Sequence, residues 1–179
     1  MKIAAISGSL RAGSSNTAAL RAAARLAPAG VEVLPFAGIA DLPFFNPDLD
    51  GDDVPAPVDA MRKLVGNVDG LLISSPEYAR GVAGVLKNAL DWLVGSHEFP
   101  NKPVALINTS PRATHALAAL TLTLETMSAR LATDACVTLP LLGGAWDEHR
   151  IAADPAVAEP LRLAMERFAA FISAVQAEA

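Results

Sequence analysis

Short apolar runs alternate with helix-forming stretches along the chain, and this alternation restricts the fold more than any other feature. The runs KIAAIS, DGLLISS and PVALINT are apolar at nearly every position. Such runs are typical of strands that have both faces covered in a parallel sheet. We expect strands at 2–7, 31–36, 69–75, 103–109 and 134–138, and helices at 15–28, 57–67, 83–95, 114–131 and 155–177. With right-handed crossovers these elements give a three-layer α/β sandwich.

The length and composition suit one globular domain that spans residues 1–179. A chain of 179 residues, of which 52% are hydrophobic, can bury a proper core but is too short for two full domains. The apolar runs are too short to cross a bilayer, so we expect no membrane association. The first residues, MKIAAIS, read as a buried strand and not as a signal peptide, so we expect a cytoplasmic protein.

The charged residues and potential metal ligands exclude several classes of protein. The net charge is −5 and the basic residues form no stripe, which argues against nucleic-acid binding. The single cysteine, Cys136, lies in an apolar strand pattern and is expected to be an inert core thiol. His97, His115 and His149 lack metal-ligand spacing, so we predict no metal site.

One irregular stretch, residues 41–57, partly resembles a calcium loop. Four of its residues fall at the first, third, fifth and sixth positions of that pattern: Asn46, Asp48, Asp50 and Gly51. The twelfth position is Pro57, where a bidentate Glu is needed, and no helix leads in. The stretch is better interpreted as a solvated acidic loop.

The loop after the first strand, SGSLRAGSSNT, predicts a phosphate site. It connects a strand to a helix at the carboxyl edge of the sheet, where a helix N-terminus offers free N–H groups and a positive dipole end. Arg11 supplies a bidentate cation, and Gly8 and Gly13 let the backbone close around an anion. Hydroxyl and amide donors come from Ser9, Ser14, Ser15, Asn16 and Thr17. The alternative interpretation is that residues 14–17 merely cap the helix.

The motif distinguishes among three classes of phosphate ligand. A triphosphate P-loop requires Lys directly after its second Gly, and here Ser14 stands in that position. The dinucleotide fingerprint needs G-x-G-x-x-G, whereas this loop reads GSLRAG. A single phosphate monoester bound without metal remains, and a mononucleotide such as FMN fits it.

A second loop, SPEYARG, and the helix after it complete the pattern. Together, GSLRAGSSN and SPEYARGVAGVLKNALDW resemble the NADPH-dependent FMN reductase family, particularly its quinone and chromate reductases. The usual forms there are G-S-x-R-x-x-S-x-N and [TS]-P-E-Y-N-x-x-x-x-x-x-L-K-N-A-[IL]-D-W. The resemblance covers the chain from end to end and implies a flavodoxin-like sandwich, in which helices cover both faces of a five-stranded parallel sheet of order 2-1-3-4-5.

The resemblance also implies a set of FMN-binding residues. The phosphate is expected on the first loop, through Ser9, Arg11, Ser14, Ser15, Asn16 and Thr17. The isoalloxazine ring is expected over the second loop, formed by Pro76, Glu77, Tyr78, Ala79, Arg80 and Gly81. Thr109, Ser110 and Arg112 follow the fourth strand, where relatives carry a Ser/Gly-rich turn. Arg112 either lies near the flavin N1–C2=O region or is a solvated turn residue.

Two further regions depart from the family or have an open role. Ala79 replaces the usual Asn, so a side-chain contact is expected to be missing there. The helix that carries Lys87 and Asp91 is interpreted as scaffold and subunit interface, since the family forms dimers or tetramers through this region. Trp146, in LLGGAWD, is expected to border a neighbouring subunit's site.

The implied function is an FMN-dependent NAD(P)H oxidoreductase. NADPH or NADH would deliver hydride to the flavin, and a quinone, free flavin, azo compound or chromate would accept the electrons. The flavin carries the chemistry, so no catalytic side chain is assigned. The alternative is a flavodoxin-type electron carrier, although carriers have a Ser/Thr-rich loop and more aromatic residues than this chain. A phosphoesterase or nucleotide-binding regulator is disfavoured because no nucleophile stands beside the loop.

Overall fold

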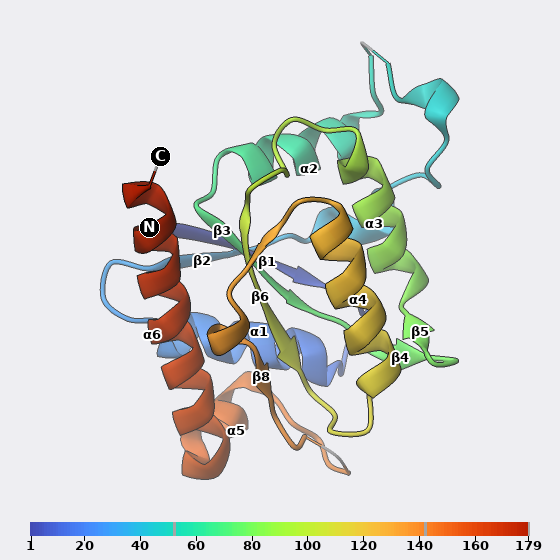
Figure 1. Cartoon of the computed structure of the whole chain (residues 1–179). Coiled ribbons are helices and arrows are strands. Elements are labelled where there is room, and N and C mark those ends of the chain that lie inside the picture. The colour runs from blue at the N-terminus through green and yellow to red at the C-terminus, as the bar shows by residue number, and fades with distance from the viewer. Residues whose placement is uncertain (52, 142, 179) are drawn as a thin grey trace.

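A parallel sheet forms the centre of the molecule (Figure 1), which is described here from a computed structural model that covers residues 1–51, 53–141 and 143–178. Its strands are β1 (Lys2–Ser7), β2 (Glu32–Pro35), β3 (Gly70–Ser74), β6 (Pro103–Asn108) and β7 (Arg130–Leu131), in the order β2-β1-β3-β6-β7. All of these neighbours pair in parallel. The predicted fold class and strand order are therefore confirmed.

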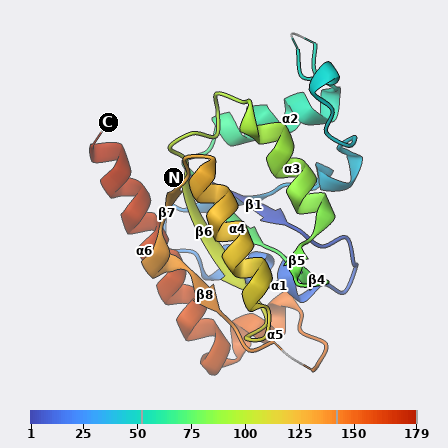
Figure 2. The ribbon, with the colours of Figure 1, turned by 45° about the vertical axis from the view of Figure 1, so that its right-hand side comes forward.

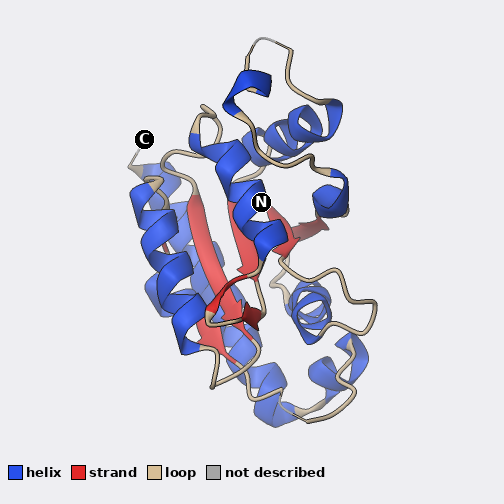
Figure 3. Cartoon of the chain, turned by 90° about the vertical axis from the view of Figure 1, so that its right-hand side faces the viewer, coloured by secondary structure: helices blue, strands red, loops and turns tan. Residues whose placement is uncertain are grey.

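Helices cover both faces of the sheet and create two hydrophobic cores (Figures 2 and 3). One core lies against α1 (Ser15–Leu26), α5 (Glu148–Ala153) and α6 (Pro155–Ala177). The other lies against α2 (Ala56–Gly66), α3 (Gly84–Val94) and α4 (Thr114–Thr126). Every residue of β3 and β6 is buried, as the continuous apolar runs predicted. None of the described helices is long and apolar enough to cross a bilayer.

The prediction of one strand at 134–138 is wrong. A 3₁₀ turn, η3 (Thr133–Ala135), separates β7 from β8 (Val137–Thr138), and both short strands pair with β6. In the gap, the Leu106 N–H donates to Cys136 Sγ at 3.4 Å. Burial raises the pKa of the Cys136 thiol above its ordinary value. The thiol thus fills an interruption in the strand ladder, which hydropathy alone does not reveal.

The predicted helix at 114–131 is too long, because α4 ends at Thr126. Ser128 has a φ of +63°, and the Ala129 N–H donates to the Leu124 carbonyl. This left-handed C-terminal motif stops the helix and redirects the chain into β7. Two elements were also missed: the short helix α5, capped by Asp147, and a hairpin of β4 (Glu77–Tyr78) and β5 (Gly81–Val82).

The acidic stretch 41–57 begins where one 3₁₀ turn, η1 (Gly38–Asp41), ends, and it contains a second, η2 (Pro47–Leu49). The Asn46 side chain caps η2 by accepting from the Asp48 N–H. Asp50 pairs with Arg62 at 2.8 Å, so this carboxylate serves the packing of the loop against α2.

Candidate functional site

The first loop leaves β1 and begins α1, and it leaves hydrogen-bond donors free. Ser14 is the N-cap, and its Oγ accepts from the Thr17 N–H at 3.3 Å. The N–H groups of Ser15 and Asn16 donate to no acceptor within the described part of the chain. Arg11 is exposed and lies in the same loop. The capping interpretation and the anion-site interpretation are therefore compatible, since capping uses one N–H and leaves two.

Asn16 connects the first loop to two other strands. Its Oδ1 accepts from Ser74 Oγ at 2.9 Å and from Thr109 Oγ1 at 3.2 Å, and the side chain is 5% exposed. Ser15 Oγ lies 3.4 Å from Thr109 Oγ1. A buried polar network of this kind fixes the relative positions of the loops that carry it. The Asn16 carboxamide oxygen thus positions the site, and its backbone N–H is left for a ligand.

The second loop forms a hairpin that is attached to α4. Glu77 Oε2 accepts from the Ala116 N–H at 2.8 Å, so a carboxylate from β4 caps the first turn of α4. The two turn residues, Ala79 and Arg80, have φ of 49° and 60°. Two successive positive φ values are those of a type I′ turn, which Asn and Gly adopt most easily.

In the loop after β6, side chains accept hydrogen bonds from the loop's own backbone. Asn108 Oδ1 accepts from the Ser110 N–H at 3.2 Å, and Ser110 Oγ accepts from the Arg112 N–H at 3.3 Å. These local bonds hold a turn that contains no glycine. They leave the Arg112 side chain exposed at the site.

The three loops surround one cleft of about 360 Å³ at the carboxyl edge of the sheet. Its lining includes eleven of the fifteen predicted residues: Ser9, Arg11, Ser14, Ser15, Asn16, Pro76, Glu77, Tyr78, Thr109, Ser110 and Arg112. Sequence reasoning missed Ser75, Asn108, Ala113, Leu141 and Gly143. Ser75 and Asn108 were within reach of it, because each lies within the last two residues of a predicted strand, 69–75 and 103–109.

Four predicted residues do not line the cleft. Thr17 turns away, with its Oγ1 2.8 Å from Ser7 Oγ, and lines a separate hollow between α1 and β2. Ala79, Arg80 and Gly81 lie at the hairpin turn, beyond the residues that face the cleft. The loss of a side-chain contact at Ala79 stays a prediction, and the structure shows that this residue has a left-handed backbone in the hairpin turn.

The helix motif LKNALDW has a structural role that the sequence only partly revealed. Lys87 and Asp91 form the expected ion pair across one turn. Asn88 Nδ2 and Trp92 Nε1 both donate to the Pro43 carbonyl, at 2.9 and 2.8 Å. The Phe45 and Trp92 rings pack in a T-shaped arrangement, with centroids 5.0 Å apart. The helix is therefore scaffold for the loop before α2.

The stretch LLGGAWD contributes to the cleft through its first residues. Leu141 and Gly143 line the cleft, and Leu142 lies outside the described residues. The Arg150 guanidinium lies 3.9 Å from the centroid of the Trp146 ring. Trp146 also packs against the core under α1 and α6.

A doubly wound parallel sheet with a donor-rich cleft across the ends of β1, β3 and β6 defines a flavodoxin-like α/β protein. The chain belongs to the NADPH-dependent FMN reductase family, whose model matches residues 1–140. The resemblance drawn from the two motifs is therefore confirmed.

Individual relatives match over a shorter range. NAD(P)H-dependent FMN reductase PA1204 of Pseudomonas aeruginosa is 41% identical over 112 residues, 62% of this chain and 60% of that protein. A quinone reductase of Escherichia coli K12 is 38% identical over 115 residues, again 62% of this chain and 60% of the relative. The matches thus span about 60% of the curated relatives' length. Among solved structures, the flavoenzyme NAD(P)H:(acceptor) oxidoreductase FerB of Paracoccus denitrificans is 28% identical, with a TM-score of 0.73 over 98% of this chain and 97% of FerB.

Proposed function

We propose that the protein is an FMN-dependent NAD(P)H oxidoreductase that reduces a quinone-like acceptor, free flavin, or another small acceptor such as an azo compound or chromate. The observation that carries this proposal is one cleft in which the free donors of the first loop face the Pro76–Tyr78 loop. A phosphate at the first site puts an attached ring over the second. The named relatives are reductases of flavin and quinone, which supports the same activity.

The residues of the first loop fit a phosphate monoester. The free N–H groups of Ser15 and Asn16 point from the N-terminus of α1, where the dipole favours an anion. Arg11 adds a cationic fork, and the hydroxyls of Ser9 and Ser15 add neutral donors. No metal is needed to neutralise a single phosphate that has these partners.

The second and third loops fit a flat ring with polar edges. Pro76 and Tyr78 supply a stiff apolar wall, and Ser110 and Arg112 supply donors to the same cleft. FMN, when bound, supplies hydride acceptance and electron transfer. The protein's contribution is to bind and orient the cofactor, and Arg112, which lines the cleft, is the candidate cation for the negative charge of the reduced ring.

A flavodoxin-type electron carrier is the second candidate, and the site favours it less. Tyr78 is 54% exposed and is the only aromatic residue among the described residues that line the cleft, so these residues offer no pair of aromatic walls for the ring. An open ring face suits a second substrate that stacks on it.

We further propose that the protein works in the cytoplasm on small-molecule acceptors, as a homodimer or homotetramer. The Lys87–Asp91 ion pair on α3, and the loop before α2 that α3 holds through the Pro43 carbonyl, support an interface in this region. No part of this proposal requires nucleic acid or a membrane.

The proposal is tested with the purified protein, titrated with FMN and assayed for NADPH and NADH oxidation with quinones, FMN, azo dyes and chromate. We expect a yellow, tightly bound FMN complex and turnover with at least one acceptor. Saturable FMN binding without any nicotinamide oxidation would favour the carrier. Absence of both FMN binding and turnover would refute the assignment.

A further inference from the structure

A second hollow lies between α1 and β2, the edge strand of the sheet. It has a volume of about 230 Å³, and none of its lining residues also lines the cleft. Seven of the ten lining residues are apolar, and the bulkiest of them are Leu20, Val33 and Phe36. The hollow is therefore a separate space that the proposed function does not use.

The walls of the hollow are held in place by hydrogen bonds within the chain. The Phe36 N–H donates to the Ala5 carbonyl at 2.9 Å, so the pairing of β1 with β2 continues past Pro35 into the wall. Ser7 Oγ and Thr17 Oγ1, from the two hydroxyl residues of the lining, lie 2.8 Å apart and satisfy each other. A ligand therefore meets a preformed and mainly apolar surface, which lowers the entropic cost of binding.

Arg21 gives this apolar hollow a positive charge. It is the only charged residue of the lining, its side chain is exposed, and it takes part in none of the ion pairs between described residues. Arg25, one turn further along α1, differs because its guanidinium lies 3.4 Å from His149 Nε2. An unpaired guanidinium beside an apolar surface favours a ligand that carries a carboxylate.

The size of the hollow restricts the ligand to a small molecule. Pockets for drug-sized ligands span roughly 300–1,000 Å³, and this hollow is smaller. Along α1 the lining runs from Thr17 to Ala24, a length of about 10 Å for seven steps along a helix. These dimensions suit a short alkyl chain or a single aromatic ring.

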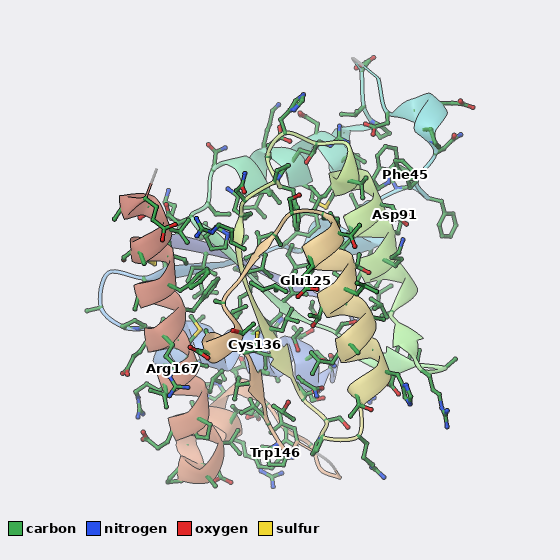
Figure 4. All side chains as sticks on the ribbon, viewed as in Figure 1. Phe45, Asp91, Glu125, Cys136, Trp146 and Arg167 are labelled. Carbon is green, nitrogen blue, oxygen red and sulfur yellow. The ribbon has the colours of Figure 1, made fainter. Side chains whose placement is uncertain are left out.

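The hollow lies on the face of the sheet opposite to α3. The buried residues of α1 belong to one hydrophobic core, and those of α3 belong to the other. Figure 4 labels Phe45 and Asp91 beside α3, on the side where we propose a subunit interface. An interface at α3 therefore leaves the hollow between α1 and β2 uncovered.

We propose that this hollow is a binding site for a small amphipathic monocarboxylate, either a medium-chain fatty acid or an aromatic acid. The apolar body of the ligand packs against Leu20, Val33 and Phe36, and its carboxylate pairs with the Arg21 guanidinium. Neither FMN nor the reductase activity takes part in this binding, so the site is independent of the proposed function.

The first experiment is isothermal titration calorimetry of the full-length protein with three probes. Octanoate has both the apolar body and the charge, octan-1-ol has the body alone, and acetate has the charge alone. We expect octanoate to saturate one site, octan-1-ol to bind about three- to fivefold more weakly, and acetate to bind at least about a hundredfold more weakly. Equal affinities for octanoate and acetate, or for octanoate and octan-1-ol, would overturn the proposal. Benzoate, compared with octanoate, distinguishes an aromatic acid from a fatty acid.

The second experiment changes the two parts of the hollow separately. Arg21→Gln should weaken octanoate about three- to fivefold and leave octan-1-ol unchanged, whereas Arg25→Gln, on the same helix outside the hollow, should change neither. Ala24→Phe fills the hollow from an exposed position and should weaken both probes at least about tenfold. Its control is Ala118→Phe, at an exposed position of α4. Circular dichroism verifies that the four variants fold.

A third measurement distinguishes the hollow from the cleft, because Arg11 and Arg112 of the cleft also attract a carboxylate. We expect Arg11→Ala to bind octanoate as the wild type does, and saturating FMN to leave octanoate bound. Loss of octanoate binding in Arg11→Ala but not in Arg21→Gln would place the probe in the cleft and overturn the proposal. That result would leave the assignment of FMN to the cleft untouched.

Discussion

The two main loops of the cleft, Gly8–Thr17 and Pro76–Gly81, are held in place by different physical means. In the first loop, local preferences agree with the structure: Ser14 caps α1, and the free N–H groups arise from the helix end itself. In the second loop, Ala79 and Arg80 adopt left-handed backbone conformations that neither residue favours. A tertiary contact, Glu77 to the Ala116 N–H, holds that loop. One loop is therefore locally relaxed, and the other is stabilised by its attachment to α4.

Because of this difference, we expect substitutions in the two loops to change different quantities. Substitutions in the first loop should act on phosphate affinity with little effect on folding, because its exposed side chains have few internal partners. Substitutions in the hairpin should act on the free energy of unfolding and, through Pro76 and Tyr78, on the ring wall. The following variants test the two sides of this distinction.

Arg11→Ala should have the largest effect, and only on binding. Loss of a charge-assisted contact should weaken FMN binding by about 1.5–3 kcal/mol, measured by fluorescence titration. The control is Arg21→Ala, which removes an exposed arginine of α1 that does not line the cleft. Unchanged affinity in Arg11→Ala would refute the phosphate role of the first loop.

Glu77→Ala should act mainly on stability. It removes a charged acceptor from the first turn of α4, and we expect the free energy of unfolding to fall by about 1–2 kcal/mol in urea denaturation. Glu77→Gln keeps an acceptor and should lose less. Glu125→Ala, in the last turn of the same helix, removes a carboxylate from the negative end of the dipole and should be neutral or slightly stabilising. Equal losses for Glu77→Ala and Glu125→Ala would contradict the capping role.

Ala79→Asn should stabilise the hairpin. Because a left-handed backbone costs most L-residues about 1–2 kcal/mol and Asn tolerates it better, we expect a gain of about 0.5–1 kcal/mol. Thermal unfolding measures it, with Ala24→Gly on exposed α1 as a control that should lose stability. A destabilised Ala79→Asn would show that the turn conformation is not limited by residue preference.

The fold was predictable because β1, β3 and β6, at the centre of the sheet, each consist of one nearly continuous apolar run. The phosphate loop was predictable for a similar reason: its Gly, Ser and Arg residues lie within a single strand–helix connection. The fifth strand was not predictable from its own sequence, since the interruption between β7 and β8 depends on a contact with another strand, in which the Leu106 N–H donates to Cys136 Sγ.

The β4–β5 hairpin, and the hydrogen bonds from α3 to the loop before α2, depend on contacts between residues that are distant in the sequence. Glu77 and Ala116 are 39 residues apart, and Trp92 and Pro43 are 49 apart. Ala and Arg are among the last residues that turn statistics would place in a type I′ turn. Here the tertiary bond to α4 overrides local preference, so no pattern around residues 77–82 indicated a hairpin.

Arg112→Ala should have the smallest effect and resolves the open role of this residue. Arg112 lines the cleft, whereas Arg80 is also exposed but lies at the hairpin turn outside it. If Arg112 interacts with the pyrimidine side of the ring, its removal should lower the flavin reduction potential and weaken FMN binding by about 0.2–1 kcal/mol, as for an exposed charge pair. The same titration on Arg80→Ala should show no change. Equal behaviour of the two variants would make Arg112 a solvated turn residue and leave Arg11 as the cation that selects the ligand.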